Sequence, residues 1–165
     1  MQNPRAHELA ERLAELNGEI IRFVQECPKF VWESPCPDDG RPVGVVAHHI
    51  ASSHAPIVQL LMLMANGEPV PSITAAMLDQ ANAHHAAQSA GCTPDEVVEL
   101  LRARGREACD AVRGLSNEQL SRRASGELFG ARMSTEELVE NVLIGHAAGH
   151  FTRIKGVAKG IPASS

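Results

Sequence analysis

Several features that would place a protein in a specialised class are missing from this sequence of 165 residues. Its longest apolar stretch, Ile57 to Ala65, is interrupted by Gln59 and is far shorter than the roughly 20 residues of a membrane-spanning helix. The formal net charge is -5, and no basic cluster offers a footprint for nucleic acid or an anionic membrane. Residues 1–8 lack the apolar core of a secretory signal. We therefore predict a cytoplasmic protein with neither a membrane nor a nucleic acid as partner.

Cysteine is present, but without the spacing of a zinc knuckle or a thioredoxin motif. Cys27, Cys36, Cys92 and Cys109 include no C-x-x-C pair and no shared local cluster with histidine. The first two could approach each other across a short connection, but a reducing compartment disfavours a disulfide. We therefore expect reduced and mostly structural thiols.

The size and the apolar pattern predict one helical domain. A chain of this length with 44% hydrophobic residues can bury one core and is too short for two ordinary domains. No stretch alternates with period two for long enough to predict a strand, and no repeat is present. Apolar residues instead recur at steps of three and four, which is typical of amphipathic helices. The predicted helices run from about Arg5 to Cys27, Val43 to Met64, Ile73 to Ala90 with a weaker pattern, Pro94 to Leu115, and from Ser134 to the glycines at 156 and 160.

Capping boxes support these helix starts. In residues 93–96, 116–119 and 134–137, a serine or threonine is followed three residues later by glutamate or glutamine. Pro56 within the second helix predicts a kink, and residues 122–133 form a connection with an extended part. Four long amphipathic helices bury their apolar faces together in a four-helix bundle. The predicted fold class is all-α, a single four-helix-bundle domain over residues 1–165 with one additional weaker helix.

Two histidines four residues apart, His146 and His150, lie within an otherwise apolar helical segment. Side chains at i and i+4 share one helix face, so both imidazoles can bind a single metal ion, as in the H-E-x-x-H motif of zinc proteases. The glutamate of that motif is Ala147 here, so the general base of a protease is missing. The alternative is a pair of core histidines satisfied by hydrogen bonds, but two neutral imidazoles in an apolar stripe need partners, which a metal supplies.

A third ligand is required, because two imidazoles alone would bind a metal loosely. The second predicted helix offers His48 or His49. His84 and His85 are adjacent and therefore about 100 degrees apart on a helix, so only one of them can face the core. We expect a solvated or hydrogen-bonded role for both.

The sequence resembles the DinB-like superfamily, a group of four-helix metal-binding proteins, in three places. Residues 39–51, D-G-R-P-V-G-V-V-A-H-H-I-A, are similar to its second-helix pattern D-G-W-S-V-x-x-V-L-A-H-I-A. Residues 146–154 resemble its last-helix pattern H-x-x-x-H-R-G-Q-I, and residues 82–116 resemble its middle region. Ungapped alignment puts the first metal histidine of the family on His49. The sequence departs from the family at Arg41, where tryptophan is common, and at residues 151–153.

The resemblance implies a DinB-like bundle in which one divalent metal is bound by His49, His146 and His150. Three neutral histidines leave an open coordination position, which is the arrangement of a catalytic site. An all-histidine set suits zinc or nickel, and manganese or iron stay open because no carboxylate ligand distinguishes them. Glu140 and Asn141 are candidate partners for the outer nitrogens of the histidines on the last helix. No catalytic residue is assigned.

Members of the superfamily are thiol-dependent transferases and isomerases that use bacillithiol or mycothiol, and others are called hydrolases. No cysteine of this chain falls at the predicted site, which argues for a thiol taken from solution. The resemblance therefore implies a metal-dependent transferase or isomerase acting on a small electrophile. The alternatives are a metal-dependent hydrolase, a stress-response bundle that binds metal without turnover, and a metal-free dimerisation unit. Candidate partners are a small-molecule substrate, a low-molecular-weight thiol and, in a homodimer, a second copy of the chain.

Overall fold

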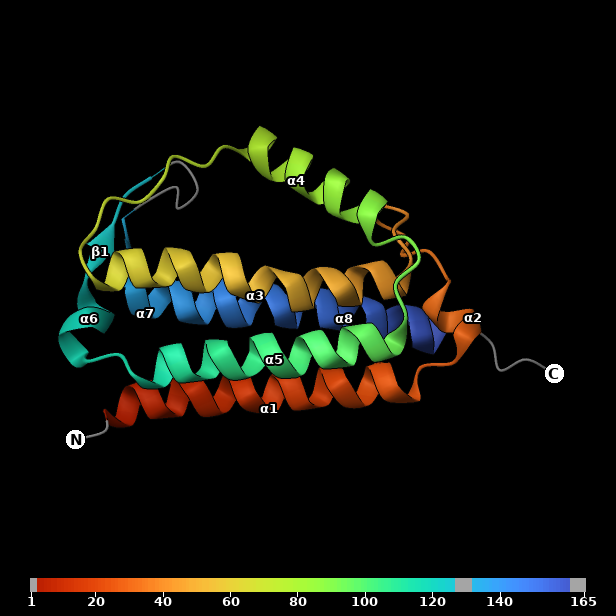
Figure 1. Ribbon diagram of the computed structural model, residues 1–165, viewed down its shortest axis with the longest axis horizontal. Coiled ribbons are helices and arrows are strands. Elements are labelled where there is room, and N and C mark those ends of the chain that lie inside the picture. Colours follow the sequence, from red (N-terminus) through yellow and green to blue (C-terminus); the bar gives the residue numbers. More distant parts are fainter. Residues whose placement is uncertain (1–2, 127–131, 161–165) are drawn as a thin grey trace.

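Four long helical segments lie side by side in the computed structural model, which describes residues 3–126 and 132–160 (Figure 1). The first three are α1 (Pro4–Glu26), α3 (Val43–Ala65) and α5 (Pro94–Arg113). The fourth joins α7 (Thr135–Glu137), the π-helix η2 (Leu138–Ile144) and α8 (Gly145–Gly160). In the bundle α1 packs on α5, α5 on α3, and α3 on α8. The predicted all-α class and the four-helix bundle are thus confirmed.

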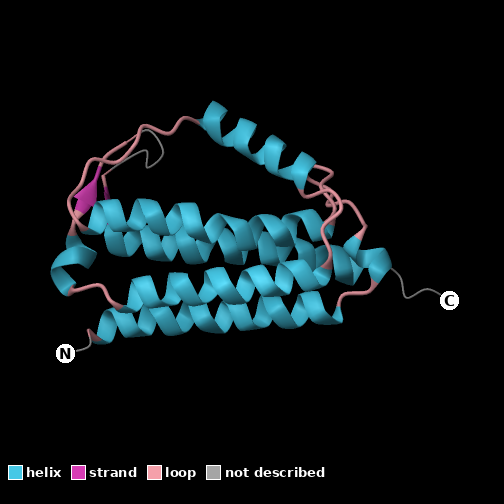
Figure 2. Cartoon of the chain, viewed as in Figure 1, coloured by secondary structure: helices cyan, strands magenta, loops and turns pink. Residues whose placement is uncertain are grey.

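Short elements connect the long ones (Figure 2). α2 (Lys29–Trp32) forms a turn that the sequence pattern did not indicate, and α6 (Asn117–Ser121) is the predicted short turn. The extended part of the connection after α6 is an antiparallel pair of two-residue strands, β1 (Arg123–Ala124) and β2 (Met133–Ser134). Residues 127–131 of that connection lie outside the described residues.

The helix ends follow the capping signals of the sequence. At Thr93, Ser116 and Ser134 the hydroxyl accepts the backbone N–H of the third following residue, whose side chain accepts the N–H of the cap residue. Each box satisfies two backbone donors that the first turn leaves without partners. α3 continues through Pro56, and α8 continues through Gly156. The glycine at 156 therefore does not end the last helix, in contrast to the prediction.

Two apolar clusters fill the bundle, one toward each end. The first contains Leu9, Leu13 and Leu61, and the second contains Ile50 and Phe151. A polar layer also crosses the interior, where Asn17 Oδ1 of α1 lies 2.9 Å from His54 Nε2 of α3. Both side chains are buried, so this contact provides a hydrogen bond that buried polar groups need.

The fourth helical segment changes its register before the histidines. A π-helical stretch adds a residue to the turn and rotates the residues that follow it. The buried positions are accordingly Leu138, Val139, Leu143 and Ile144 in η2, followed by Ala147. The predicted i, i+4 stripe from the start of this helix is therefore interrupted, because the pattern of apolar residues does not distinguish an α-helical from a π-helical turn.

The weaker predicted helix exists as α4 (Ala75–Gln88), but it stands apart from the bundle (Figures 1 and 2). All its residues are described, and none of them is buried. Met77 is 50% exposed, and Leu78 is 40% exposed. The weaker apolar pattern of this segment therefore corresponds to a helix without a buried face. Its apolar residues are too few to form a stripe that would hold it against α3.

In the part of the chain that the structure describes, no helix is both long and apolar enough to cross a membrane. The four cysteines carry free thiols. Burial raises the pKa of each thiol, and raises that of Cys109 to about 11. The thiols are therefore poor nucleophiles at neutral pH.

A Gly44→Ala substitution is expected to destabilise the fold by about 1 to 3 kcal/mol, as overpacking does in other cores. A Cβ at this position would lie 2.5 Å from Nε1 of Trp32. The indole cannot move freely, because its Nε1–H donates to the carbonyl of Cys92 at 3.0 Å. Urea unfolding followed by the fluorescence of the single tryptophan measures the change.

Gly18→Ala is the matched control, since a Cβ there meets nothing within 4 Å. It should stabilise the protein slightly, because alanine favours the helix more than glycine does at an exposed position. Equal stability of both variants would contradict the prediction.

Candidate metal centre

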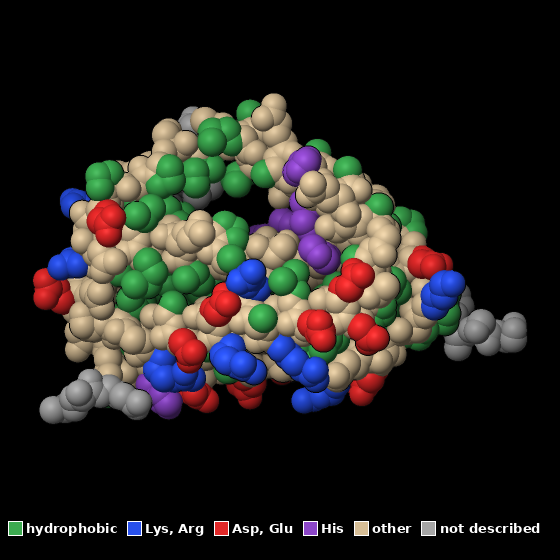
Figure 3. Space-filling model, in the orientation of Figure 1, with side chains coloured by type: hydrophobic (Ala, Val, Ile, Leu, Met, Phe, Trp, Pro, Cys, Tyr) green, Lys and Arg blue, Asp and Glu red, His purple; other side chains and the backbone are tan. Residues whose placement is uncertain are grey.

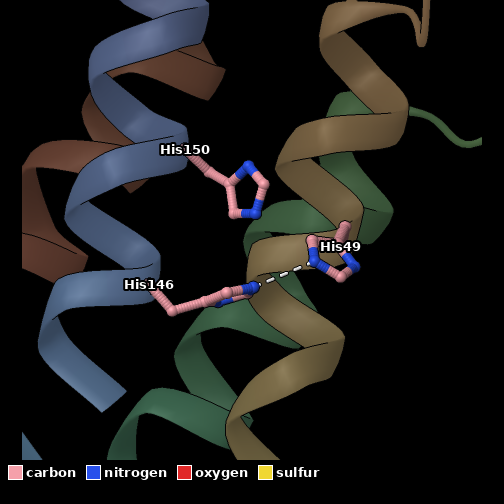
Figure 4. Close-up of side chains that lie close together, drawn as sticks. All are labelled: His49, His146 and His150. Carbon is pink, nitrogen blue, oxygen red and sulfur yellow. Dashed lines mark hydrogen bonds between the residues drawn. The ribbon is translucent and has the colours of Figure 1, made fainter. Parts of the chain in front are cut away.

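Three histidines from two helices converge inside the bundle (Figure 4). His49 comes from α3, and His146 and His150 come from successive turns of α8. Each offers one ring nitrogen, and these three atoms lie within 4.8 Å of one another. The Nε2 atoms of His49 and His146 are 3.0 Å apart. The structure thus brings together the three residues that were predicted as ligands.

The spacing of the nitrogens fits a single divalent ion. Zn–N bonds of about 2.0–2.1 Å in a tetrahedron place two ligand nitrogens about 3.3 Å apart. The separations in the cluster range from 3.0 Å for His49 and His146 up to 4.8 Å, so small rotations of the rings would complete the geometry. His150 Nδ1 is buried, and it hydrogen bonds to none of the residues that the structure describes.

Burial keeps all three imidazoles neutral. It is the main cause that lowers the pKa of His49 to about 3 and that of His150 to about 4, and the pKa of His146 is lowered as well. Positive charge on neighbouring histidines and on Arg41 lowers the pKa of His49 and His150 further. Metal binding requires neutral imidazole, so the site holds its histidines in the reactive form at neutral pH.

His48 points away from this cluster and toward α4. Its Nδ1 lies 2.7 Å from Nε2 of His85, and the Ser89 hydroxyl lies 3.2 Å from the first of these atoms and 3.1 Å from the second. The choice between His48 and His49 is thus decided by which way each ring points, because residues adjacent in a helix face different directions. The hydrogen-bonded role expected for His85 is confirmed, and His84 is exposed.

His85 borders the cluster, which sequence reasoning missed. Its ring centre lies 5.4 Å from that of His49. Figure 3 shows a hollow between α4 and the bundle, with histidine side chains on its wall. α4 therefore forms one side of the approach to the three histidines. No period in the sequence of α4 signals this contact, because the helix has no buried face.

Replacing His85 by alanine is expected to release α4 from the bundle. The helix buries none of its described residues, so the hydrogen bond between His85 and His48 of α3 is a main anchor. Amide hydrogen exchange in residues 75–88 should become faster, while exchange in α1 and α5 stays unchanged. His84→Ala is the matched control, because His84 is exposed and should leave the exchange as it is. Equal exchange in both variants would show that other contacts hold α4.

Two predicted outer partners do not reach the histidines. Glu140 forms ion pairs with Arg5 and, at 3.4 Å, with Arg12 of α1. Asn141 is exposed. Neither of these two candidates therefore lies beside the histidines. Glu140 precedes His146 by six residues, which is about 9 Å along a helix, and the π-helical turn lies between them.

Arg41 is a further charged neighbour of the cluster. It precedes the N-terminus of α3, and its side chain is only 16% exposed. Its Nε atom forms an ion pair with Asp39 Oδ2 at 2.8 Å, and its backbone N–H donates to Oδ1 of the same carboxylate. The sequence identified this position only as a departure from the family pattern.

Comparison with known proteins supports the fold. No family model matches the sequence, and no curated protein matches it. A solved structure with a similar fold is that of YfiT from Bacillus subtilis, described as a probable metal-dependent hydrolase with an unusual four-helix bundle topology. It aligns with a TM-score of 0.78 and 19% identity over 96% of this chain and 89% of YfiT. The Sibling Lethal Factor Precursor DfsB aligns with a TM-score of 0.67 and 15% identity over 95% of this chain and 96% of its own.

These matches define the class of protein at the level of the fold. The chain has the four-helix-bundle fold of YfiT, in agreement with the DinB-like resemblance of the sequence. Its interior carries a cluster of three histidines whose nitrogens could hold one metal ion.

Proposed function

We propose that this protein is a metal-dependent enzyme that binds one divalent ion through His49, His146 and His150. The convergence of three neutral imidazoles, one buried and two partly buried, on one point carries the proposal. The description of YfiT as a probable metal-dependent hydrolase supports a metal-dependent activity in a bundle of this shape. Zinc and nickel suit an all-histidine set. A small molecule would enter through the hollow between α4 and the bundle, which has histidine side chains on its wall (Figure 3).

Thiol transfer to a small electrophile is the reaction that we propose. A divalent ion at this position would lower the pKa of a coordinated thiol or water. A thiol needs no further base once it is ionised, whereas hydrolysis commonly uses a positioned general base. The glutamate of H-E-x-x-H is Ala147, and the nearest acidic side chains on the loop before α3, Asp38 and Asp39, are paired with Arg153 and Arg41. The four cysteines of the chain lie outside the histidine cluster, so the thiol would come from solution.

A hydrolase is the second candidate, and the description of YfiT is the observation that favours it. The two activities share the metal and the three histidines. They differ in the nucleophile, which is a thiol in one and water in the other. An assay with and without thiol therefore separates them.

Metal-loaded protein is expected to conjugate a small thiol to a reactive electrophile and to show little esterase activity. We would assay 1-chloro-2,4-dinitrobenzene with several low-molecular-weight thiols, and 4-nitrophenyl acetate without thiol. His150→Ala should remove the metal-dependent rate, because the two remaining imidazoles bind the metal only loosely. Robust ester hydrolysis without thiol that is lost in this variant would overturn the transferase proposal in favour of a hydrolase.

A further inference from the structure

The side chain of Arg41 is largely buried, and Nη1 of its guanidinium is a buried donor without a partner among the described residues. Nη1 is buried, and no residue in the described ranges 3–126 and 132–160 accepts a hydrogen bond from it. Nε is already engaged by Asp39 at 2.8 Å. A buried cationic donor without an acceptor is unfavourable, because folding removes its hydrogen bonds to water and no protein acceptor replaces them. Such a donor is available to a ligand.

The guanidinium lies at the same end of the bundle as the histidines. Arg41 stands two residues before the start of α3, and His49 follows that start by six residues, or about 9 Å along the helix axis. The positive charge of Arg41 lowers the pKa of His49, His146, His150 and His85, so its guanidinium lies within electrostatic range of the cluster. The burial of Nη1 shows that this nitrogen is turned away from the outer surface of the loop.

The balance of charge around the cluster calls for an anion. Asp39 is paired with Arg41, and Asp38 is paired with Arg153 at 3.0 Å. The two acidic and two basic groups cancel, so a divalent ion among neutral histidines would leave the site with a net positive charge. An anionic group between that ion and Arg41 would offset this charge and accept a hydrogen bond from the guanidinium.

We propose that Arg41 binds a carboxylate carried by the small molecule that approaches the histidine cluster, through its buried and unused Nη1. This inference rests on the proposed function. It narrows the substrate class to small thiols that carry a carboxylate, or to electrophiles that carry one. Arginine suits the task because its guanidinium stays charged and donates directional hydrogen bonds to carboxylates.

The test compares acids with their esters on cobalt-substituted protein. Mercaptoacetate, 3-mercaptopropionate and their methyl esters are titrated, and binding is measured by the sulfur-to-cobalt absorption band rather than by activity. Wild type should bind each acid at least about tenfold more tightly than its ester, since a charge-assisted hydrogen bond in a buried site has about this effect. Arg41→Gln should reduce that preference to near one, and Arg41→Lys should keep part of it.

Arg153→Gln is the matched control, because Arg153 also pairs with an aspartate and its charge also acts on His146 and His150, but its side chain is 54% exposed to solvent. It should keep the full preference for the acids. Cobalt stoichiometry and the ligand-field spectrum report whether the histidine cluster is intact in each variant. An equal preference in wild type and Arg41→Gln, with cobalt bound in both, would overturn the role of Arg41 and leave the proposed metal site standing. Equal affinity of wild type for acid and ester would by itself overturn the role of Arg41. Absence of cobalt binding in wild type would overturn the metal site and this inference together.

Discussion

Replacing His49, His146 or His150 by alanine is expected to abolish stoichiometric binding of the divalent ion. Each variant leaves only two imidazoles, either both on α8 or one on α3 and one on α8. Two ligands do not enclose an ion. The rest of the fold should persist, because these rings belong to neither of the two apolar clusters that make up the core. Elemental analysis of protein purified without an affinity tag, before and after metal reconstitution, gives the ratio of metal to chain.

His48→Ala is the matched control for this experiment. His48 is adjacent to His49 in the sequence, but its ring is bound to His85 instead of the cluster. It should keep one ion per chain. Saturating metal should also raise the free energy of unfolding of wild type by about 2.7 kcal/mol at a hundredfold excess over Kd, and it should not do so for His150→Ala. Full metal content in His49→Ala together with its loss in His48→Ala would contradict the assignment of the third ligand.

The spacing of His146 and His150 made the helix-borne pair predictable from the sequence. Two residues four apart share a face whether or not the preceding turn is π-helical, so the local pattern sufficed. His49 needed more, because the periodicity alone left it open against His48. The ungapped match of residues 39–51 to the family pattern pointed to His49, whose ring does join the cluster.

His85 and Arg41 could not be predicted as neighbours of the cluster. His85 lies on α4, whose position depends on a few contacts of the folded chain and not on an apolar stripe. Arg41 lies in the proline-rich loop before α3, where side-chain direction follows from the path of the loop. That path is fixed by tertiary contacts, such as the backbone hydrogen bonds from Cys36 to Arg41 and from Val43 to Ser34. Local sequence contains little information about such contacts.

Acidifying the metal-free protein from pH 7 to pH 5 is expected to lower its free energy of unfolding by several kcal/mol. Burial keeps His54 neutral in the folded state until its pKa of about 4, and His49 and His150 behave in the same way with pKa values of about 3 and 4. In the unfolded chain a histidine takes up a proton below about pH 6.5. The unfolded state therefore binds more protons in this range, so stability is fully present above pH 6.5 and is lost as the pH falls toward 4. For a fully buried histidine the loss at pH 5 is about 2 kcal/mol, at 1.36 kcal/mol for each pH unit below 6.5.

His54 isolates one share of this effect, because it is 1% exposed and lies outside the proposed metal ligands. In His54→Gln, the amide can replace the hydrogen bond to Asn17, yet it does not titrate. Urea unfolding at pH 7 and pH 5 in the presence of a chelator should therefore show a pH-dependent loss about 2 kcal/mol smaller in the variant than in wild type. The remaining loss of stability comes mainly from His49 and His150. The contribution of His150 is smaller, because its side chain is less buried and solvent screens its charge. The same loss in both proteins would mean that His54 takes up its proton in the folded state, and that the polar layer it forms with Asn17 admits charge.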